Sequence, residues 1–394
     1  MAPSDPRQCD VAVVGAGPSG LATAIGLAQR GVRTALVTGP ARGPDTRTTA
    51  LMEGSVRFLD GLGLWDALAP HAAPLRDLRL IDATRRLVRA PEVLFRAAEI
   101  GLEAFGYNIE NDALRGVLRE AAGGLPNLTI VSASVEEAMA GADEIVLGLD
   151  DGGSIRARLA IAADGRHSRL REAAGIAVRS RAYPQVALTF TVRHTRPHEE
   201  VSTEFHSETG PFTLVPLPGL RSSIVCVVDE RTAVRLLGLD PSALARELER
   251  RAGSLLGAFT LEDGRGAFPL AAEAAEHLIA PRLVLIAEAA HVMPPIGAQG
   301  LNLGLRDAAA IVALAGETVA AGGDPGAEPL LARYAGTRSR DIETRMAAVD
   351  VLNRSLLSDL LPVQGMRGLG LYLMERIGPL RRGLMRLGAG LRAA

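Results

Sequence analysis

Two glycine-rich stretches lie far apart in this 394-residue sequence, and both could bind an anionic or electron-rich ligand through the backbone. The first, Gly15–Gly20, has the spacing G-x-G-x-x-G. The second, Pro294–Asn302, follows the short apolar run Leu283–Ala287, which predicts a buried strand. Each stretch leads into apolar residues at helical spacing, and the unpaired N–H groups at a helix start carry partial positive charge. Taken alone, the second stretch is more typical of an ordinary strand–helix connection.

The elements predicted around the first stretch are those of a dinucleotide-binding fingerprint. Val11–Val14 is a short apolar run, a helical pattern follows the glycines, and Thr34–Val37 is the next predicted strand. In this arrangement Gly15 permits the tight turn, Gly17 lets a pyrophosphate approach the backbone, and Gly20 allows close helix–strand packing. The sequence therefore predicts nucleotide binding here.

The end of the second predicted strand departs from that fingerprint. Thr38 stands where an acidic residue normally binds the ribose, and its hydroxyl makes a weaker hydrogen bond than a carboxylate. Arg42 nearby would fit the 2′-phosphate of NADP, although we favour a solvated loop arginine.

Further polar residues lie at predicted element boundaries. Arg47 precedes a segment expected to lead into a helix, and it could lie over a pyrophosphate or be a surface charge. Asn111 or Asp112 is expected to cap the next helix. Asp164 ends the apolar run of residues 159–163 and begins an Asp-Gly pair, which in isolation is usually a turn.

Composition excludes several classes of protein. Hydrophobic residues make up 47% and charged residues 22%, as in a folded globular protein, and a net charge of −2 argues against a nucleic-acid partner. The only cysteines, Cys9 and Cys226, give neither a disulfide framework nor a cysteine metal cluster, and we predict no metal site. The first residues lack a signal-peptide pattern, and no apolar run is long enough to span a bilayer. A cytoplasmic enzyme is the expectation.

The predicted fold class is α/β, with interleaved domains. Residues 1–180 together with 280–350 form a Rossmann-like domain. Residues 181–279 contain β-rich runs separated by proline and glycine turns, which predicts an inserted antiparallel sheet that binds substrate. Residues 351–394 form a helical C-terminal segment.

The end of the chain combines an apolar helical stripe with basic residues. The stripe consists of Met366, Leu369, Leu373, Ile377, Leu380, Leu384, Leu387 and Leu391. Six arginines lie between these positions against one acid, Glu375, and Gly378-Pro379 is expected to divide the segment into two short helices. Such a segment suits the headgroup layer of an anionic membrane, or it packs on the parent domain or a second subunit.

Three motifs in order resemble the FAD-dependent aromatic hydroxylases of the para-hydroxybenzoate hydroxylase superfamily: Gly15–Gly20, Asp164-Gly165, and Glu288 with the loop 294–302. Four further segments are similar to the ubiquinone-biosynthesis hydroxylases within that superfamily, and the similarity covers nearly the whole chain. These segments are Arg47–Leu51, Ile109–Asn111, Gly210–Gly219 and Gln299–Gly304.

The resemblance implies a set of FAD-binding residues. The first glycines would hold the pyrophosphate with Asp164 beside it, Arg47 and Asn111 would flank the pyrophosphate and ribityl chain, and the loop from Gly297 would border the isoalloxazine ring. The full set is Gly15, Ala16, Gly17, Pro18, Ser19, Gly20, Thr38, Arg47, Asn111, Asp164, Glu288, Pro295, Gly297, Gln299, Gly300, Leu301 and Asn302. Ala287-Glu288 departs from the family's Gly-Asp pair, although Glu288 still offers a carboxylate to a ribityl hydroxyl.

The resemblance also implies the chemistry. Reduced flavin would react with O2 to form a C4a-hydroperoxide that hydroxylates an electron-rich phenol, so the cofactor carries the difficult step. Only one fingerprint loop is present, so NAD(P)H would visit transiently as reductant. His206 and His291 could assist deprotonation of the phenol, but we favour a structural role for each and assign no catalytic residue.

The resulting hypothesis is an FAD-dependent monooxygenase that hydroxylates a polyprenylated phenol in ubiquinone biosynthesis. The alternatives are a flavin hydroxylase of a soluble aromatic or polyketide, and a non-catalytic scaffold of a quinone-biosynthesis complex. Expected partners are the phenol, O2, and either a membrane at the inner face of the cell through the C-terminal segment, a biosynthetic complex, or a second copy of the chain.

Overall fold

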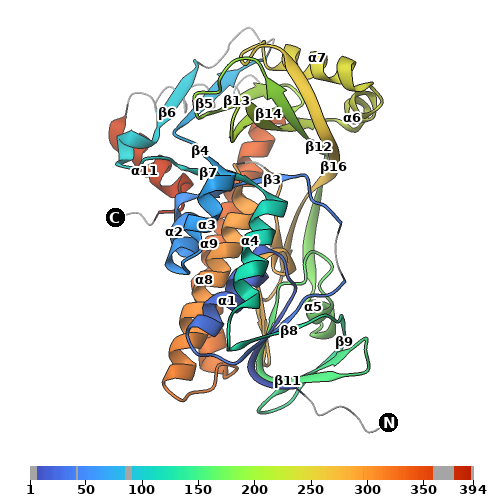
Figure 1. Ribbon diagram of the computed structural model, residues 1–394, viewed down its shortest axis with the longest axis vertical. Coiled ribbons are helices and arrows are strands. Elements are labelled where there is room, and N and C mark those ends of the chain that lie inside the picture. The colour runs from blue at the N-terminus through green and yellow to red at the C-terminus, as the bar shows by residue number, and fades with distance from the viewer. Residues whose placement is uncertain (1–6, 41–42, 85–90, 296, 358–376, 392–394) are drawn as a thin grey trace.

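The computed structural model describes residues 7–40, 43–84, 91–295, 297–357 and 377–391. Figure 1 shows two units stacked along the long axis of the molecule. The first unit, at the lower end and centre, contains a largely parallel sheet and most of the helices. The second unit, at the upper end, is built around a largely antiparallel sheet.

The first sheet is parallel at its centre, and its central strands are buried on both faces, as is usual for parallel strands. Its order is β17 (Ile279–Ala280), β18 (Leu283–Leu285), β11 (Ser154–Ala162), β1 (Arg7–Val14), β2 (Thr34–Val37) and β8 (Leu128–Val131), with the hairpin β9 (Val135–Ala140) and β10 (Ile145–Leu149) paired to β11. Strands β1 and β2 lie where the sequence predicted them. Strand β18 is shorter than expected, because the chain turns at Ala287 into the short 3-10 helix η3 (Ala287–Ala289).

The helices of the first unit pack closely on one another beside this sheet, and Figure 1 shows α1, α4, α8 and α9 in the centre of the molecule. They are α1 (Pro18–Gln29), α2 (Glu53–Gly61), α3 (Trp65–Leu68), α4 (Asn111–Gly123), α5 (Arg169–Ala173), α8 (Gln299–Ala320) and α9 (Glu328–Leu357). Glycines allow the close approach of α1 and α8. A Cβ on Gly304 would lie 2.7 Å from Ser19 Oγ and 2.8 Å from Ala287 Cβ, and a Cβ on Gly26 would lie 2.9 Å from Val312.

A small third sheet connects the two units. It consists of β3 (Thr48–Met52), β7 (Gly106–Glu110) and β4 (Ala72–Pro74). The segment after Arg47, expected to lead into a helix, forms β3 before the helix α2 begins at Glu53. The threonine-rich sequence of β3 suits an extended strand better than a helix.

The second sheet is antiparallel except where β13 pairs with β5. Its order is β19 (His291–Val292), β16 (Phe259–Ala275), β12 (Val178–His194), β15 (Arg221–Val228), β14 (Gly210–Leu217), β13 (Val201–Ser207), β5 (Asp77–Asp82) and β6 (Val93–Arg96). Strands β5 and β6 therefore join this sheet from a segment that we assigned by sequence to the Rossmann-like domain. The domain boundaries themselves stay a prediction.

The two faces of the second sheet have different neighbours. One face packs its apolar side chains under α6 (Glu230–Leu237) and α7 (Pro241–Arg251). The opposite face, which we call the inner face, turns toward the first unit. Ser223 Oγ accepts a hydrogen bond from Thr48 Oγ1 at 2.8 Å, and Asn108 Nδ2 donates to the carbonyl of Pro216 at 2.9 Å. The inner face also carries an apolar cluster of Ala187, Val225, Val227 and Leu270.

The C-terminal segment returns to the junction of the units. Helix α9 ends at Leu357, and α11 (Gly378–Gly388) begins at the predicted Gly378-Pro379 pair. Helix α11 packs beside β6 and the short 3-10 helix η2 (Ala97–Ile100). The part of the predicted stripe from Met366 to Leu373 lies outside the described residues. Among the helices that the structure describes, none has the length and apolar character required to cross a bilayer.

Replacing Gly304 with alanine tests the α1–α8 contact. The added Cβ must displace Ser19 or Ala287, so we expect a net loss of about 1–2 kcal/mol in the free energy of unfolding, because overpacking outweighs the gain in helix propensity. Gly336→Ala is the matched control: a Cβ there meets nothing within 4 Å, so it should stabilise α9 by up to about 1 kcal/mol. Urea unfolding measures both, and equal stability of the two variants would contradict the packing described.

Candidate functional site

The glycine fingerprint forms a turn that only glycine fits. Gly15 has φ +112°, and its N–H donates to the carbonyl of Val37 at 2.8 Å. A Cβ at Gly15 would lie 2.2 Å from the carbonyl oxygen of Ala163, and a Cβ at Gly20 would lie 2.0 Å from the carbonyl oxygen of Gly15. These two glycines therefore allow the turn and the close packing of α1 against the sheet, the roles that their spacing predicts.

The start of α1 leaves space for a ligand. Gly17 is the N-cap of α1, Pro18 is the first helical residue, and a Cβ added to Gly17 would meet nothing within 4 Å. Ser19 is buried, yet its Oγ has no hydrogen-bond partner among the described residues. A buried hydroxyl without a partner is costly, so a ligand oxygen at this turn would satisfy it. Ala16 is half-buried in the same turn.

Asp164 lies next to this turn, at the end of β11. Its Oδ2 accepts the backbone N–H groups of Arg169 at 2.9 Å and Leu170 at 3.4 Å, which caps α5. Its buried Oδ1 has no partner in the part of the chain that the structure describes, and burial raises the pKa of this carboxyl. One oxygen of Asp164 is therefore structural and the other is available to a ligand.

Thr38 directly follows β2, as predicted. Its hydroxyl donates to the carbonyl of Gly39 at 3.2 Å, and its own N–H donates to the carbonyl of Val131. The hydroxyl can still accept a hydrogen bond, so Thr38 remains a predicted ligand of the cofactor. Arg42, considered for a 2′-phosphate, lies outside the described residues.

Arg47 and Asn111 come together around Asp45, which sequence reasoning missed. Arg47 Nε donates to Asp45 Oδ1 at 2.7 Å, and Asn111 Nδ2 donates to Asp45 Oδ2 at 3.1 Å. Although burial acts to raise the pKa of Asp45, the hydrogen bonds from Arg47 and Asn111 outweigh it and lower that pKa. The Arg47 guanidinium also lies 5.0 Å above the ring of Phe268.

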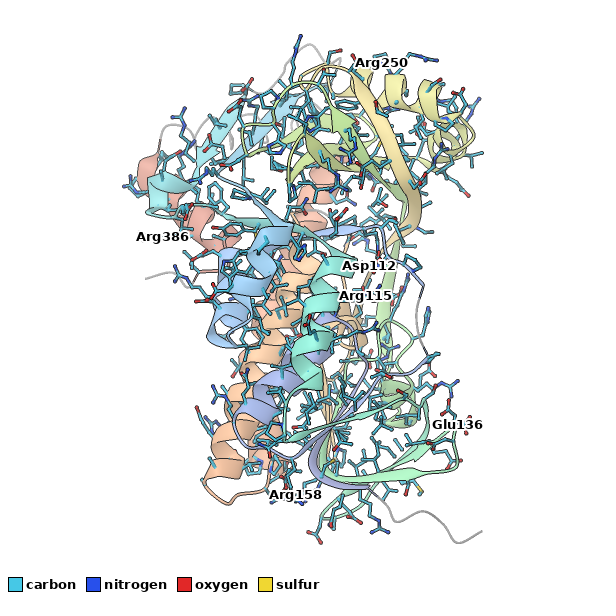
Figure 2. All side chains as sticks on the ribbon, in the orientation of Figure 1. Asp112, Arg115, Glu136, Arg158, Arg250 and Arg386 are labelled. Carbon is cyan, nitrogen blue, oxygen red and sulfur yellow. The ribbon has the colours of Figure 1, made fainter. Side chains whose placement is uncertain are left out.

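The predicted helix cap beside this cluster is wrong. Glu110 occupies the N-cap position of α4, and Asn111 is the first helical residue, with its Oδ1 accepting from Thr49 Oγ1 at 2.7 Å. Asp112 instead accepts the backbone N–H of Asp45 at 3.0 Å and pairs with Arg115, both visible at the start of α4 in Figure 2. Both polar side chains instead fix the loop of residues 45–47. Glu110 is the N-cap because it is the last residue of β7 and keeps an extended conformation.

The Ala287-Glu288 pair forms the strained turn of η3. Ala287 has φ +52°, a left-handed conformation that costs a residue with a Cβ roughly 1 kcal/mol. This geometry explains why glycine would be favoured here. Glu288 is exposed, and its charge contributes to raising the pKa values of Arg47 and Arg166, so its carboxylate lies in the field of both guanidinium groups.

The buried carboxylate of Asp307 holds this turn, and sequence reasoning missed it. Asp307 Oδ2 accepts the N–H of Ala287 at 3.0 Å and lies 2.6 Å from His291 Nε2, while Oδ1 accepts from Arg338 Nε at 2.7 Å. Burial would raise the pKa of Asp307, but the charges and hydrogen bonds of His291 and Arg338 outweigh it and lower that pKa. The available signal was an aspartate inside the apolar pattern of α8. His291 therefore has the structural role that we favoured.

The loop before α8 turns through two left-handed residues. Gly297 has φ +67°, and Ala298, the N-cap of α8, has φ +53°. Gln299 is held on both sides: its Nε2 donates to the carbonyl of Gly297 at 2.8 Å, and its Oε1 accepts from Arg345 Nη1 at 2.6 Å. Gly300 is exposed, with open space where a Cβ would lie. Of the other predicted residues here, Pro295 is exposed and Leu301 is half-buried.

Asn302 differs from the other loop residues because its side chain is fully occupied by protein. Its Oδ1 accepts from Met52 N at 2.8 Å and Ser55 Oγ at 2.7 Å. Its Nδ2 donates to the carbonyls of Ala50 at 2.7 Å and Ala298 at 2.6 Å. All its hydrogen-bonding capacity is used, so Asn302 anchors the start of α8 to β3 and α2. Any contact between this residue and a ligand would be through its backbone.

The two distant glycine-rich stretches thus form one site. Gly304 of α8 packs against both Ser19 of α1 and Ala287 of η3, which joins the fingerprint turn, the strained turn and the second helix start. The polar groups here are an open helix start at Gly17, the Ser19 hydroxyl and the acceptor oxygen Oδ1 of Asp164, both without a partner among the described residues, and nearby guanidinium groups. This set fits a dinucleotide that contains a pyrophosphate.

Comparison with known proteins decides the family. The family described as FAD binding domain matches residues 8–347. The chain belongs to this family. It is an FAD-dependent monooxygenase, as its similarity to curated relatives over nearly its whole length shows.

Two relatives illustrate the similarity of this family member. Ubiquinone hydroxylase UbiL of Rhodospirillum rubrum is 37% identical, and the alignment covers 98% of this chain and 90% of that protein. The 3-demethoxyubiquinol 3-hydroxylase of Escherichia coli is 32% identical, with 97% and 98% covered. The structure of p-nitrophenol 4-monooxygenase PnpA from Pseudomonas putida shares the fold, with TM-score 0.80, 20% identity, and 98% and 100% covered.

FAD is the cofactor of this enzyme, and NAD(P)H is the typical reductant of its family. When bound, reduced FAD supplies the electrons that activate O2. Gly17, Ser19, Asp164 and Arg47 would hold the cofactor on the pyrophosphate side, and the backbone around Gly300 would offer N–H groups at the start of α8. The residue assignments stay predictions that the geometry supports.

Ser19→Ala tests whether the Ser19 hydroxyl contacts a ligand or stabilises the fold. Because Ser19 Oγ has no partner among the described residues, its removal should leave the apoprotein as stable as before, or up to about 1 kcal/mol more stable. Loss of a hydrogen bond to FAD should weaken FAD binding roughly three- to tenfold, measured by titration of the apoprotein. Thr23→Val is the control: that hydroxyl already donates to the carbonyl of Ser19, so its loss should lower stability and leave FAD affinity unchanged. Unaltered affinity in Ser19→Ala would contradict the assignment.

Asp307→Asn tests the buried carboxylate. Removing one partner of a buried ionic cluster should lower the free energy of unfolding by about 3 kcal/mol at neutral pH. The folded-state pKa of Asp307 is lowered, so its contribution is present above the unfolded pKa, about 3.9, and is lost as pH falls through the folded-state value. The difference between wild type and variant should therefore shrink below about pH 4 in denaturant unfolding. Exposed Asp143→Asn should change stability by less than about 0.5 kcal/mol, and an equal effect of both substitutions would overturn the role of Asp307.

Proposed function

We propose that this monooxygenase hydroxylates the aromatic ring of a polyprenylated phenol in ubiquinone biosynthesis, with NAD(P)H and O2 as co-substrates. The observation that carries the proposal is the full-length similarity to ubiquinone hydroxylase UbiL, at 37% identity over 98% of this chain. Substrate classes within one fold differ widely, so this relative and the inner face of the second sheet support the proposal, whereas the fold alone does not.

The inner face of the second sheet supports an apolar substrate. The cluster of Ala187, Val225, Val227 and Leu270 lies on the side turned toward the FAD-binding unit. An apolar wall beside the flavin would bind a prenyl chain by removing its surface from water. It would also keep water away from the reacting oxygen, which an oxygenase requires.

Among the two histidines considered for deprotonation of the phenol, only His206 remains a candidate. His291 is fully buried against Asp307. His206 alternates with Phe205, which packs on the α6–α7 side, so it belongs to the inner face. His206 Nε2 lies 2.8 Å from Glu204 Oε1, whose second oxygen accepts from Thr213 at 3.3 Å. This arrangement would orient the ring of His206, and we assign it no catalytic step.

A soluble aromatic substrate is the second candidate function. p-Nitrophenol 4-monooxygenase PnpA, which shares the fold, is named for a substrate without a lipid chain, so the fold itself accommodates this class as well. The scaffold alternative is set aside, because the chain belongs to an enzyme family and, within the described part of the chain, retains buried polar groups without a protein partner that suit FAD. A cytoplasmic location, peripheral attachment at the inner face of the cell membrane, and membership of a quinone-biosynthesis complex or homodimer stay proposals.

The purified holoenzyme should hydroxylate a prenylated phenol and discriminate against the same phenol without the chain. With 18O-labelled O2 and NADPH or NADH, we expect one labelled oxygen in the product. We expect kcat/KM at least about tenfold higher for the prenylated phenol, because each buried methylene contributes about 0.8 kcal/mol and tenfold corresponds to about 1.4 kcal/mol. Equal values for the two phenols would favour the soluble-substrate function. NAD(P)H oxidation without a labelled product from either phenol would reject both.

A further inference from the structure

Helix α11 is fixed to the enzyme by one face. The guanidinium of Arg381 donates to Glu99 Oε2 at 2.7 Å and lies 4.6 Å above the ring of Phe95. On the same side, Met385 and Ala389 are only 6% and 1% exposed. This spacing of four residues is one helical face, so α11 is docked on η2 and β6. The sequence alternative of packing on the parent domain therefore holds for this face.

The end of α11 is tied to the FAD-binding unit. The carbonyl of Ala389 accepts the N–H of Gly54 in α2 at 3.1 Å. The neighbouring Met52 and Ser55 donate to Asn302, which anchors the start of α8. Helix α11 is thus held in a defined orientation relative to the cofactor site.

The opposite face of α11 is apolar and exposed. Leu384 and Leu387 are 42% and 51% exposed. Ile377, four residues before Arg381 and just before the helix, lies toward the docked side and is 43% exposed. Leu384 and Leu387 are one turn apart and share a side of the helix. Large aliphatic residues are usually buried. A single exposed leucine is common, but three exposed aliphatic residues within eleven positions indicate an interaction surface.

Basic residues flank these leucines without any acid. Arg382 and Arg386 are exposed, and Figure 2 shows Arg386 beside α11 at the margin of the molecule. The segment from Ile377 to Leu391 contains no Asp or Glu, and the neighbouring Glu99 is already paired with Arg381. On α2, Arg57 and Glu53 pair with each other. Arg386 lies about 100° around the helix from Leu387, so the exposed surface of α11 is positively charged beside its apolar side.

Helix α11 also adjoins the substrate-facing sheet. Leu78 of β5 packs into the cluster around Met385 and alternates with Ile81 on the α6–α7 side, so Leu78 lies on the inner face. The docked side of α11 thus contacts the β5–β6 end of the sheet whose inner face is proposed to hold the substrate.

We propose that the exposed side of α11, formed by Leu384 and Leu387 with Arg386 beside them, docks on an anionic lipid surface. The inference rests on the proposed function, because a lipid-tailed substrate resides in a membrane. Charge favours a lipid surface over a second copy of the chain. In a symmetric dimer this face would meet itself and bring like charges together. Anionic headgroups complement the arginines, and the leucines enter the headgroup boundary.

The test is vesicle binding of the full-length holoenzyme without substrate. Vesicles of phosphatidylcholine alone are compared with vesicles that also contain phosphatidylglycerol, by flotation and by titration. We expect clear binding to the anionic vesicles, weakening with added salt, and much weaker binding to the neutral ones. Absence of binding to anionic vesicles overturns the proposal.

Paired variants identify the face. Leu384→Ser with Leu387→Ser should abolish binding to anionic vesicles, and Arg382→Gln with Arg386→Gln should weaken it by roughly fivefold per arginine. Met139→Ser with Val234→Ser is the matched control, because these residues are 63% and 68% exposed on β9 and α6, and its binding should equal wild type. FAD content and thermal unfolding check that each variant is folded. Binding that survives both α11 pairs overturns the proposal.

Light scattering after gel filtration tests whether a second copy of the chain, instead of a membrane, covers this side of α11. If the wild type is dimeric and the leucine pair makes it monomeric, the face joins two copies and the lipid proposal is overturned. Because vesicle binding is measured without turnover, its failure leaves the proposed hydroxylation intact. Loss of hydroxylation with retained vesicle binding would instead reject only the proposed function.

Discussion

The close approach of α1 and α8 is the constraint on which the site depends. Gly304 leaves no room for a side chain between Ser19 and Ala287, so the helices meet almost backbone to backbone. This contact places the start of α1 near the start of α8, although about 280 residues of chain separate them. Two helix starts with unpaired N–H groups would then serve one elongated ligand, with charge at one end and an electron-rich ring at the other.

Buried polar groups hold this arrangement in a strained conformation. Ala287 adopts a left-handed turn that an L-residue disfavours, and Asp307 stabilises it by accepting its N–H while it pairs with His291 and Arg338. Asn302 restrains the start of α8, because its side chain hydrogen-bonds to four groups, on Ala50, Met52, Ser55 and Ala298. Strain at a functional site persists only where the surroundings overdetermine it, and these contacts provide that restraint.

The second sheet and α11 complete the molecule around that centre. The sheet packs one face on α6 and α7 and turns its inner face to the cofactor unit through Ser223 and Asn108. Helix α11 adjoins the edge of the same inner face and, through Gly54, the helix that Asn302 anchors. The elements proposed to bind the cofactor, the substrate and the membrane thus pack against one another.

The sequence alone determined the features that depend on local geometry: the fingerprint turn, β1 and β2, the antiparallel sheet, and the start of α11 at Gly378. Glycine spacing and apolar periodicity specify such elements because the interactions involved are between near neighbours. Only the tertiary structure showed that Asp45 joins Arg47 to Asn111, that Asp307 holds Ala287, that Asn302 is saturated by protein, and that β5 and β6 join the second sheet. These depend on partners up to about 250 residues away, and a single sequence carries no local pattern that identifies such partners.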